Sequence, residues 1–406
     1  MKKSLLLSIV FILIGFCSFA QWNPISSGTT VNLTRAVFPD AMTGYAVGDG
    51  GAILQTTNGG SNWSDQPSGT THNLLSVFFP DPSTGYAAGD SGTIIKTIDG
   101  GNSWIALSSG TVYRLYSIYF IDNNTGFAAG GDFGEGIILR TIDGGTTWTD
   151  VLNTGTSEIR SVHFMDANTG FAAGYLGTIV KTTDGGMTWN SLSSGTTQTL
   201  FSIFFPDDIT GYTVGVGGTI LKTSNGGFTW SGLSSGLADY LFSVCFTDAN
   251  TGYVVGGYLN STGIWGHIYK TTDGGVTWDN QFESTESLNS VFFQDGNTGY
   301  AAGADGTILK TTDGGVPPTG TEENRLIESF KVYPNPATGK INIESSESGS
   351  HQDVTVCIYG MNGREMIKQK VYGSRAELNV SSLPQGIYFI RLTNSENTMS
   401  VKFVKE

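Results

Sequence analysis

Thr169-Gly170-Phe171-Ala172-Ala173-Gly174 and the nearby Thr182-Thr183-Asp184-Gly185-Gly186-Met187-Thr188-Trp189 form one copy of a unit that recurs along this sequence of 406 residues. An alternating apolar run and an Asp precede each copy of the hexamer, and an apolar stretch separates it from the Gly-Gly turn. The hexamer Thr-Gly-aromatic-x-x-Gly begins seven times, mostly at intervals of 41 residues, at Thr43, Thr84, Thr125, Thr169, Thr210, Thr251 and Thr298. Short runs rich in Val, Ile, Phe, Tyr and Thr between Asp and Gly turns predict about four strands per repeat. Such a repeat is typical of a propeller blade.

The two ends of the array indicate a closed ring. Six of the Gly-Gly turns are followed by a Trp, but the seventh, at Asp313-Gly314-Gly315, runs into Pro317 and Pro318. Trp22 lies 41 residues before Trp63 and thus has the position of a terminal Trp without a blade before it. Pairing this first strand with the last repeat removes two unpaired sheet edges. An open solenoid, the alternative, would need polar capping repeats. We therefore predict an all-β chain with a seven-bladed β-propeller over residues 21–318.

Composition agrees with this fold and excludes some partners. The chain has 57 Gly, 12% aromatic and only 14% charged residues, which suits short strands and tight turns. A net charge of −14 gives no electrostatic basis for binding nucleic acid. The three cysteines, Cys17, Cys245 and Cys357, have neither metal-ligand spacing nor a disulfide framework. We expect no metal, no cofactor and no disulfide.

The N-terminal segment predicts export. Lys2 and Lys3 precede an apolar run from Leu5 to Phe19, and Ser18-Phe19-Ala20 offers small residues to a signal peptidase. Residues 1–20 are therefore interpreted as a signal peptide. The run is shorter than the ~20 residues that span a bilayer, so no membrane span is expected after cleavage.

The carboxylates of the Gly-Gly turns are open to a catalytic or metal interpretation and to a structural one. Asp and Asn bond their own backbone in turns, and Gly supplies positive φ. Asn58 and Asn225 replace Asp in two copies, which a turn tolerates and a general acid does not. We interpret these acids, and the Asp before each Thr-Gly, as turn residues.

The repeat also resembles known families. Boxes such as that ending at Trp189 resemble the Asp-box of sialidase-type propellers, and the whole unit is similar to the photosystem II stability/assembly factor family. This resemblance covers about residues 21–318 and implies a seven-bladed scaffold with a binding role. Photosystem assembly itself is not implied, because the C-terminal tail described below belongs to surface sorting.

No catalytic set stands out. Sialidases, as a family, use three arginines that converge on a carboxylate, and the candidates here are Arg35, Arg114 and Arg160. These fall at three different offsets in the repeat, so we expect no shared position to aim them at one point. We therefore expect no enzyme activity, and a glycoside hydrolase of the sialidase-like Asp-box class is the alternative.

Binding residues are expected where the repeats differ. Units three and six carry insertions between their second and third strands, at residues 131–136 and 257–266. In an up-and-down blade these loops share a face with the loops that enter the first strand. Drift of the loops, with aromatics covering their own loop, is the other interpretation. The candidate ligand-binding residues are Phe133, Tyr258, Trp265, Tyr113, Arg114 and Tyr240.

After a linker at residues 319–328 the repeat is lost. Residues 329–406 contain seven short candidate strands and a turn at Asn362-Gly363, which predict a small Ig-like β-sandwich. The stretches that carry a resemblance are Tyr333-Pro334-Asn335-Pro336, Gly339-Lys340-Ile341-Asn342-Ile343, Tyr359-Gly360-Met361-Asn362-Gly363-Arg364 and Leu383-Pro384-Gln385-Gly386-Ile387-Tyr388. Together they resemble the type A sorting domain of the type IX secretion system. That resemblance implies the type IX secretion machinery as a partner and a secreted or cell-surface location.

The sequence thus predicts an exported, non-catalytic binding propeller with an unknown surface protein or glycan as its ligand. A purely structural surface component is a third hypothesis.

Overall fold

The structure of the chain is a computed structural model. It describes residues 22–132, 134–152, 155, 157–260, 263–315, 330–345, 354–360, 365–371, 375–393 and 398–406. The chain divides into two compact units, Met1–Pro317 and Pro318–Glu406. The predicted signal peptide and the linker at 319–328 lie outside the described residues.

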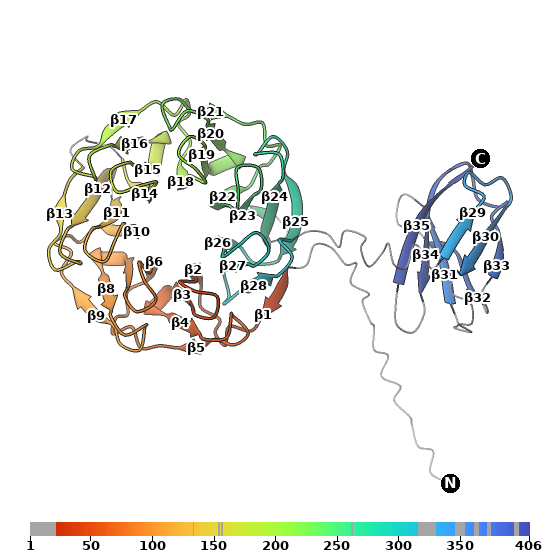
Figure 1. The fold of residues 1–406 in the computed structure, drawn as a ribbon, viewed down its shortest axis with the longest axis horizontal. Coiled ribbons are helices and arrows are strands. Elements are labelled where there is room, and N and C mark those ends of the chain that lie inside the picture. The colour runs from red at the N-terminus through yellow and green to blue at the C-terminus, as the bar shows by residue number, and fades with distance from the viewer. Residues whose placement is uncertain are drawn as a thin grey trace, which may run out of the picture. The chain divides into compact units, whose positions relative to one another are not determined.

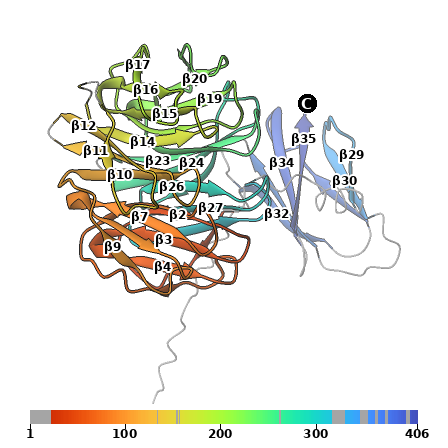
Figure 2. The same ribbon diagram turned by 60° about the vertical axis from the view of Figure 1, so that its left-hand side comes forward.

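The first unit is a propeller of seven four-stranded antiparallel blades around a central opening (Figures 1 and 2). The first two blades are β2 (Leu33–Val37), β3 (Gly44–Gly48), β4 (Ile53–Thr56) and β5 (Ser64–Asp65), then β6 (Leu74–Phe78), β7 (Gly85–Gly89), β8 (Ile94–Thr97) and β9 (Ile105–Leu107). The third and fourth are β10 (Arg114–Phe120), β11 (Gly126–Asp132), β12 (Glu135–Thr141) and β13 (Thr149–Asp150), then β14 (Ile159–Phe164), β15 (Gly170–Gly174), β16 (Ile179–Thr182) and β17 (Asn190–Leu192). The fifth and sixth are β18 (Leu200–Phe204), β19 (Gly211–Gly215), β20 (Ile220–Thr223) and β21 (Ser231–Gly232), then β22 (Tyr240–Phe246), β23 (Gly252–Asn260), β24 (Gly263–Thr271) and β25 (Asp279–Ser284).

The seventh blade is built from both ends of the propeller. Its strands are β26 (Leu288–Phe293), β27 (Gly299–Gly303), β28 (Ile308–Thr311) and the N-terminal β1 (Asn23–Ile25). The two ends pair antiparallel, with Asn23 opposite Lys310 and Ile25 opposite Ile308. The predicted ring closure is confirmed.

Trp22 fills the same site in the last blade as the terminal Trp of the other blades. It is 3% exposed and packs edge-on against Phe293, with ring centroids 5.8 Å apart and an interplanar angle of 86°. In the fourth blade, Trp189 meets Phe164 at 5.8 Å and 85°. The indole at the start of the chain therefore completes the core of a blade whose other strands lie nearly 300 residues later.

The Asp-box carboxylates hold their own turns. Asp184 Oδ1 accepts the backbone N–H of Thr188 at 3.0 Å, and the Thr188 hydroxyl donates to Oδ2 at 2.6 Å. In the fifth blade Asn225 accepts the N–H of Thr229 at 3.0 Å in the same way. The Asp before each Thr-Gly likewise accepts the two following turn amides, as Asp207 does from Ile209 and Thr210. The structural interpretation of these acids is confirmed by their hydrogen bonds.

A ring of contacts joins each box to the preceding blade. Lys222 Nζ and Tyr212 Oη both donate to the carbonyl of Gly274, at 2.8 and 2.9 Å. The equivalent donors to a box carbonyl in the other blades are Gln55, Lys96, Arg140, Lys181, Lys270 and Lys310. The aromatic residue of the hexamer thus packs between blades, and its hydroxyl adds a bond where it is Tyr.

Steric contact explains the last glycine of the hexamer. A Cβ at Gly215 would lie 1.9 Å from the carbonyl oxygen of Thr199, where the entry to strand β18 crosses the end of β19. A backbone oxygen cannot move away as the end of a flexible side chain can. The hexamer therefore needs Gly at this position in every blade.

Gly215→Ala is expected to lower the free energy of unfolding by about 1–3 kcal/mol or more, because the methyl group overpacks a backbone contact. The matched control is Gly232→Ala, where the nearest atom to a new Cβ is a Leu221 methyl at 3.9 Å. Urea unfolding of both variants checks this, and equal stabilities would contradict the steric explanation.

The loops divide between two faces of the ring. The turn between the first two strands of a blade lies with the Asp-box, as the bond from Gly59 N to Met42 O shows. The loops that enter the first strand lie with the turn between the second and third strands, as the bond from Asp49 N to Asn32 O shows. Two of these hairpins, β11–β12 and β23–β24, are longer than the rest, as predicted. We call this second face the entry face.

The second unit is a β-sandwich, as predicted. One sheet has the order β29 (Phe330–Tyr333), β30 (Lys340–Ser345) and β33 (Arg375–Asn379). The other has the order β32 (Glu365–Val371), β31 (Val354–Gly360), β34 (Gly386–Thr393) and β35 (Thr398–Lys405). Ile341 and Leu378 of the first sheet share a core with Ile358 and Phe403 of the second. The Asn362-Gly363 turn lies outside the described residues.

Cys245 and Cys357 are buried, unpaired thiols in different units. In the part of the chain that the structure describes, no helix has the length and apolarity to cross a bilayer.

Candidate binding site at the mouth of the central channel

A β-bulge near the start of each innermost strand turns one side chain toward the central channel. The pairing between the first two strands of a blade skips one residue, for example Arg160 between Ile159 and Ser161. A bulged residue leaves the alternation of the strand and points in a new direction. The seven skipped residues are Thr34, Leu75, Tyr116, Arg160, Phe201, Phe242 and Asn289.

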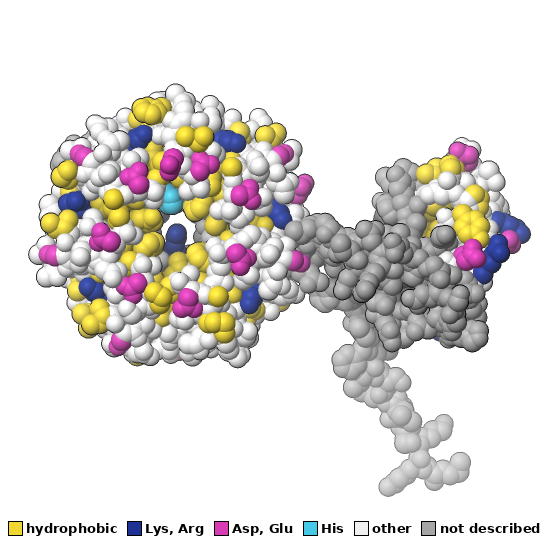
Figure 3. Space-filling view, in the orientation of Figure 1, with side chains coloured by type: hydrophobic (Ala, Val, Ile, Leu, Met, Phe, Trp, Pro, Cys, Tyr) yellow, Lys and Arg dark blue, Asp and Glu magenta, His cyan; other side chains and the backbone are white. Residues whose placement is uncertain are grey.

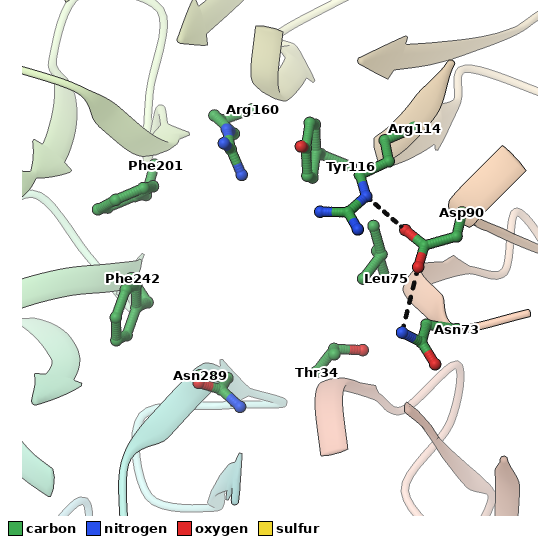
Figure 4. Close-up of a pocket in the computed structure, with 10 residues that line it drawn as sticks. All are labelled: Thr34, Asn73, Leu75, Asp90, Arg114, Tyr116, Arg160, Phe201, Phe242 and Asn289. Carbon is green, nitrogen blue, oxygen red and sulfur yellow. Dashed lines mark hydrogen bonds and ion pairs between the residues drawn. The ribbon is translucent and has the colours of Figure 1, made fainter. Parts of the chain in front are cut away.

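These seven residues line one cavity of about 350 Å³ at the entry face. Asn73, Asp90 and Arg114 complete its wall, and Figure 4 shows the side chains arranged around an open centre. A cavity of this size falls in the range of small-ligand pockets. Its wall is cationic on one side and apolar on the other.

Arg160 is the best-ordered cation of the cavity. Its guanidinium stacks over the Tyr116 ring at 3.8 Å, and Nη2 donates to Glu158 Oε2 at 3.0 Å. Its side chain is 23% exposed, and its buried Nε has no hydrogen-bond partner among the described residues. Stacking and the ion pair fix the plane of the group, so its remaining donors are preorganised for a planar anion.

Arg114 contributes a second, more exposed charge. Its Nε lies 2.9 Å from Asp90 Oδ1, and Asn73 Nδ2 donates to Asp90 Oδ2 at 3.1 Å. The Arg114 side chain is 53% exposed, so this ion pair is screened by water and contributes little to stability. A hydrogen bond with Tyr116 and the charge of Asp90 raise the pKa of Arg114, whose guanidinium faces the cavity (Figure 4).

The opposite wall is apolar. Phe201 and Phe242 lie with ring centroids 5.3 Å apart at 52°, whereas Leu75 lies on the same side as Arg114 and Asp90 (Figure 4). Tyr240, half exposed, lies edge-on to Phe242 at 6.5 Å. A ligand with an acidic group and an apolar side chain could contact the arginines with the first and the Phe rings with the second.

The structure brings only some of the predicted site residues together. Arg114 lines the cavity, and Tyr240 touches it through Phe242. Tyr113 instead donates to Glu135 Oε2 at 2.7 Å. Tyr258 and Trp265 pair across the β23–β24 hairpin, where Tyr258 stacks on His267 at 5.5 Å, and neither lines the cavity. Phe133 lies outside the described residues.

The expectation that the arginines have no common target is wrong for Arg114 and Arg160. They occupy different offsets in their repeats, but both point into the same cavity (Figure 4). Arg114 is the first residue of β10, and its long side chain reaches the cavity that the bulged residues line. Offset in the repeat is therefore a poor guide to position near the axis of a ring.

Sequence reasoning missed Tyr116, Phe201, Phe242 and Asn289. Their signal was present, since each directly follows the Leu that precedes the bulge of its innermost strand. Comparing the repeats at this position, rather than at their insertions, would have identified the ring.

The titratable groups near the channel are paired or buried. Asp90 and Glu158, the carboxylates at the mouth, each face an arginine. Burial lowers the pKa of His163 to about 4, which keeps it neutral in its packing position, as expected. In the sixth blade His267 Nδ1 lies 2.6 Å from Asp239 Oδ2, which also accepts the Tyr269 hydroxyl at 2.9 Å, and the three side chains are buried. Within the described ranges, no group of three or more His, Cys, Asp or Glu residues could hold a metal ion.

Two protein families match the sequence. The family described as "Secretion system C-terminal sorting domain" matches residues 331–406. The family described as "Photosynthesis system II assembly factor YCF48" matches residues 66–156 and 151–235. No curated protein sequence matches the chain significantly. The sorting domain marks the chain for type IX export to the cell surface or the medium.

Solved structures share the propeller. "YCF48 bound to D1 peptide" has a TM-score of 0.61 at 20% identity and covers 75% of this chain and 99% of its own. "YCF48 from Cyanidioschyzon merolae" has a TM-score of 0.59 at 20% identity and covers 71% and 98%. A GH74 enzyme from Niastella koreensis has a TM-score of 0.59 at 14% identity and covers 93% and 73%. At these identities the similarity shows the fold alone. The chain therefore joins a propeller that resembles the YCF48 assembly-factor family to a C-terminal domain that matches the secretion-system sorting family.

Proposed function

We propose that the chain is an exported, non-catalytic binding protein whose propeller holds an acidic, partly apolar segment of a protein ligand at the channel mouth. The observation that carries this proposal is the division of the cavity wall into Arg114 and Arg160 on one side and Phe201 and Phe242 on the other. A peptide with neighbouring acidic and apolar side chains matches both walls. A neutral sugar would offer the remaining donors of Arg160 no charged acceptor.

The state of the mouth carboxylates supports binding rather than hydrolysis. A glycoside hydrolase needs one carboxyl group as a general acid and a second as a base or nucleophile. Asp90 and Glu158 are instead ion-paired at 2.9 and 3.0 Å. Among the described residues that line the cavity, Asp90 is the single carboxylate, whereas this mechanism needs two.

A related fold supports a peptide as the ligand class. One of the similar structures is described as bound to a peptide. With 20% identity, this likeness does not identify the ligand or its site here. It supports a peptide as a ligand that a propeller of this fold can bind.

The test is peptide-array binding with the full chain, followed by titration of the strongest acidic–apolar peptide. Arg160→Gln is expected to weaken that peptide on the order of tenfold or more, because it removes a charge-assisted hydrogen bond. The matched control is Arg140→Gln. Arg140 donates to Gly185 O on the Asp-box face, and Gln55 makes the same bond in the first blade, so binding should not change.

Two results would overturn the proposal. Selective binding on a glycan array with no peptide bound would indicate a lectin. Turnover of a glycoside that Arg160→Gln abolishes would indicate the hydrolase.

A further inference from the structure

One position of the innermost strands forms a ring of hydrogen bonds between blades. The residue after the bulge is Ser in six blades, and its Oγ accepts the N–H of the next blade's innermost strand. Ser161 Oγ, for example, accepts from Ile203 at 3.2 Å. The other five bonds, from Ile118, Val162, Val244, Val291 and Ala36, end on Ser76, Ser117, Ser202, Ser243 and Ser290.

Arg35 interrupts this ring in the first blade. It occupies the post-bulge position of β2, where it pairs with Val47 as Ser161 pairs with Ala173. A guanidinium has donors only, so it cannot accept the N–H of Val77. Replacing the serine thus gives up one bond of the ring.

The Arg35 side chain also lacks a counter-charge. Within the part of the chain that the structure describes, it makes no ion pair and no side-chain hydrogen bond. Its side chain is exposed to solvent, although the many protein atoms around it lower its pKa. Its charge acts on His163 of β14 and Cys245 of β22, which belong to other blades. The guanidinium therefore projects into the channel, where Figure 3 shows basic atoms inside the central opening.

No described residue near it supplies a negative charge. The next ring of side chains toward the Asp-box face consists of Val37, Phe78, Tyr119, His163, Phe204, Cys245 and Phe292. Burial lowers the pKa of His163 to about 4 and raises that of Cys245 to about 11, so both are neutral at pH 7. Tyr119 and His163 lie 5.7 Å apart and His163 and Phe204 5.2 Å apart, which makes this part of the ring an aromatic collar.

A cation without a counter-charge, above a ring of neutral side chains in a narrow channel, attracts an anion. In the other six blades Ser occupies this position and adds a hydrogen bond between blades. We propose that Arg35 is the anchor of an anion-binding site inside the channel, which takes a carboxylate that enters through the mouth cavity. Thr34, the preceding residue, lines that cavity, so the two sites are continuous. As a site for part of a ligand, this proposal rests on the proposed function, with the carboxylate coming from an acidic side chain or chain terminus.

The probe for the test is glutarate, with its neutral diamide glutaramide as control, titrated into the full chain at constant ionic strength. The Arg35 Nε–H signal in ¹⁵N-resolved NMR, assigned by its loss in Arg35→Ser, should shift saturably with glutarate and not with glutaramide. Arg35→Ser should weaken glutarate binding, followed by calorimetry, on the order of tenfold or more. Because this variant restores the seventh hydrogen bond, its melting temperature without ligand should equal or exceed that of the wild type. Arg35→Lys, which keeps the charge but not the planar group, should bind with intermediate affinity.

The outcomes of this experiment distinguish the channel site at Arg35 from the cavity at the mouth. No saturable shift of Arg35, or equal glutarate binding by Arg35→Ser, overturns the channel site. So does a marked loss of stability in Arg35→Ser, since it would make the arginine a structural residue. The glutarate titration uses no peptide, so it still tests Arg35 if the peptide experiment at Arg160 fails. Conversely, if peptide binding depends on Arg160 and not on Arg35, the proposed function stands without the channel site.

Discussion

Trp22→Ala is expected to lower the free energy of unfolding by about 3–5 kcal/mol, the range for truncating a large buried aromatic side chain. A residue so near the start of a chain is usually replaceable, because termini fray. Trp22 is only 3% exposed and meets both Phe293 and Tyr253 edge-on, at 5.8 and 6.4 Å. Its loss would also loosen β1, which forms the outer edge of the last blade. Urea unfolding followed by circular dichroism measures the change.

Trp189→Ala is the matched control. Trp189 has a similar exposed fraction, 4%, and a similar aromatic neighbour, but lies in the middle of the chain. The two variants should lose comparable stability, and Trp22→Phe should lose less because it keeps a ring. If Trp22→Ala unfolds like the wild type while Trp189→Ala is destabilised, the ring does not depend on its N-terminal strand.

The second large effect is a loss of stability in acid. Hydrogen bonds from Thr188 and Thr277 lower the pKa of Asp184 and of Asp273 to about 2, and those from Ser103 and Thr147 lower the pKa of Asp99 and Asp143. The unfolded carboxyl groups have a pKa near 3.9. Below about pH 4 the unfolded chain therefore binds more protons than the folded one, so stability falls as the pH drops from about 4 toward 2. Above this window the contribution is fully present.

A fourfold Asp→Asn variant at Asp99, Asp143, Asp184 and Asp273 tests this prediction. Asn keeps the turn, since Asn225 Oδ1 accepts the N–H of Thr229 and its Nδ2 donates to the Thr229 hydroxyl at 2.8 Å. The acid-unfolding midpoint of the variant should lie at lower pH, with a smaller proton uptake on unfolding. Asp65→Asn, which removes an exposed carboxylate that makes no hydrogen bond among the described residues, should leave the profile unchanged. An unchanged midpoint in the fourfold variant would contradict the origin assigned to these pKa values.

The fold followed from the sequence because each repeat carries its own constraints. Gly215 has no room for a side chain, Asp184 holds a turn, and Trp22 fills the one vacant position in a series of Trp. These are local contacts that recur at a fixed period, so they can be predicted from the sequence alone. The strands of the sandwich were predicted from alternation and turn residues in the same way.

The site was harder to predict from the sequence because it forms at the axis, where single residues from different blades meet. Tyr113, Tyr258 and Trp265 stood out as aromatic residues near long loops, but none of them lines the cavity. Arg160 and Arg114 come together only because the ring brings β10 and β14 side by side. Loop composition indicates where the repeats differ. Which side chains meet at the axis depends instead on the radius of the ring and on the bulges of its innermost strands.

The pairing of β1 with β28 makes the seventh blade unlike the others in kinetics as well as in composition. Every other blade is a run of neighbouring hairpins, but this one must bring together residues as distant as Asn23 and Lys310, which makes its contacts the most non-local in the propeller. The pairing of β1 with β28 is therefore expected to form last during folding and to open first. An opened molecule exposes the unpaired edge of β28 and a free β1. Two such molecules can exchange these strands, so that β1 of one pairs with β28 of the other. Strand-swapped dimers and chains are therefore the expected misassembled forms of this protein, and they should accumulate in variants that weaken the anchoring of Trp22.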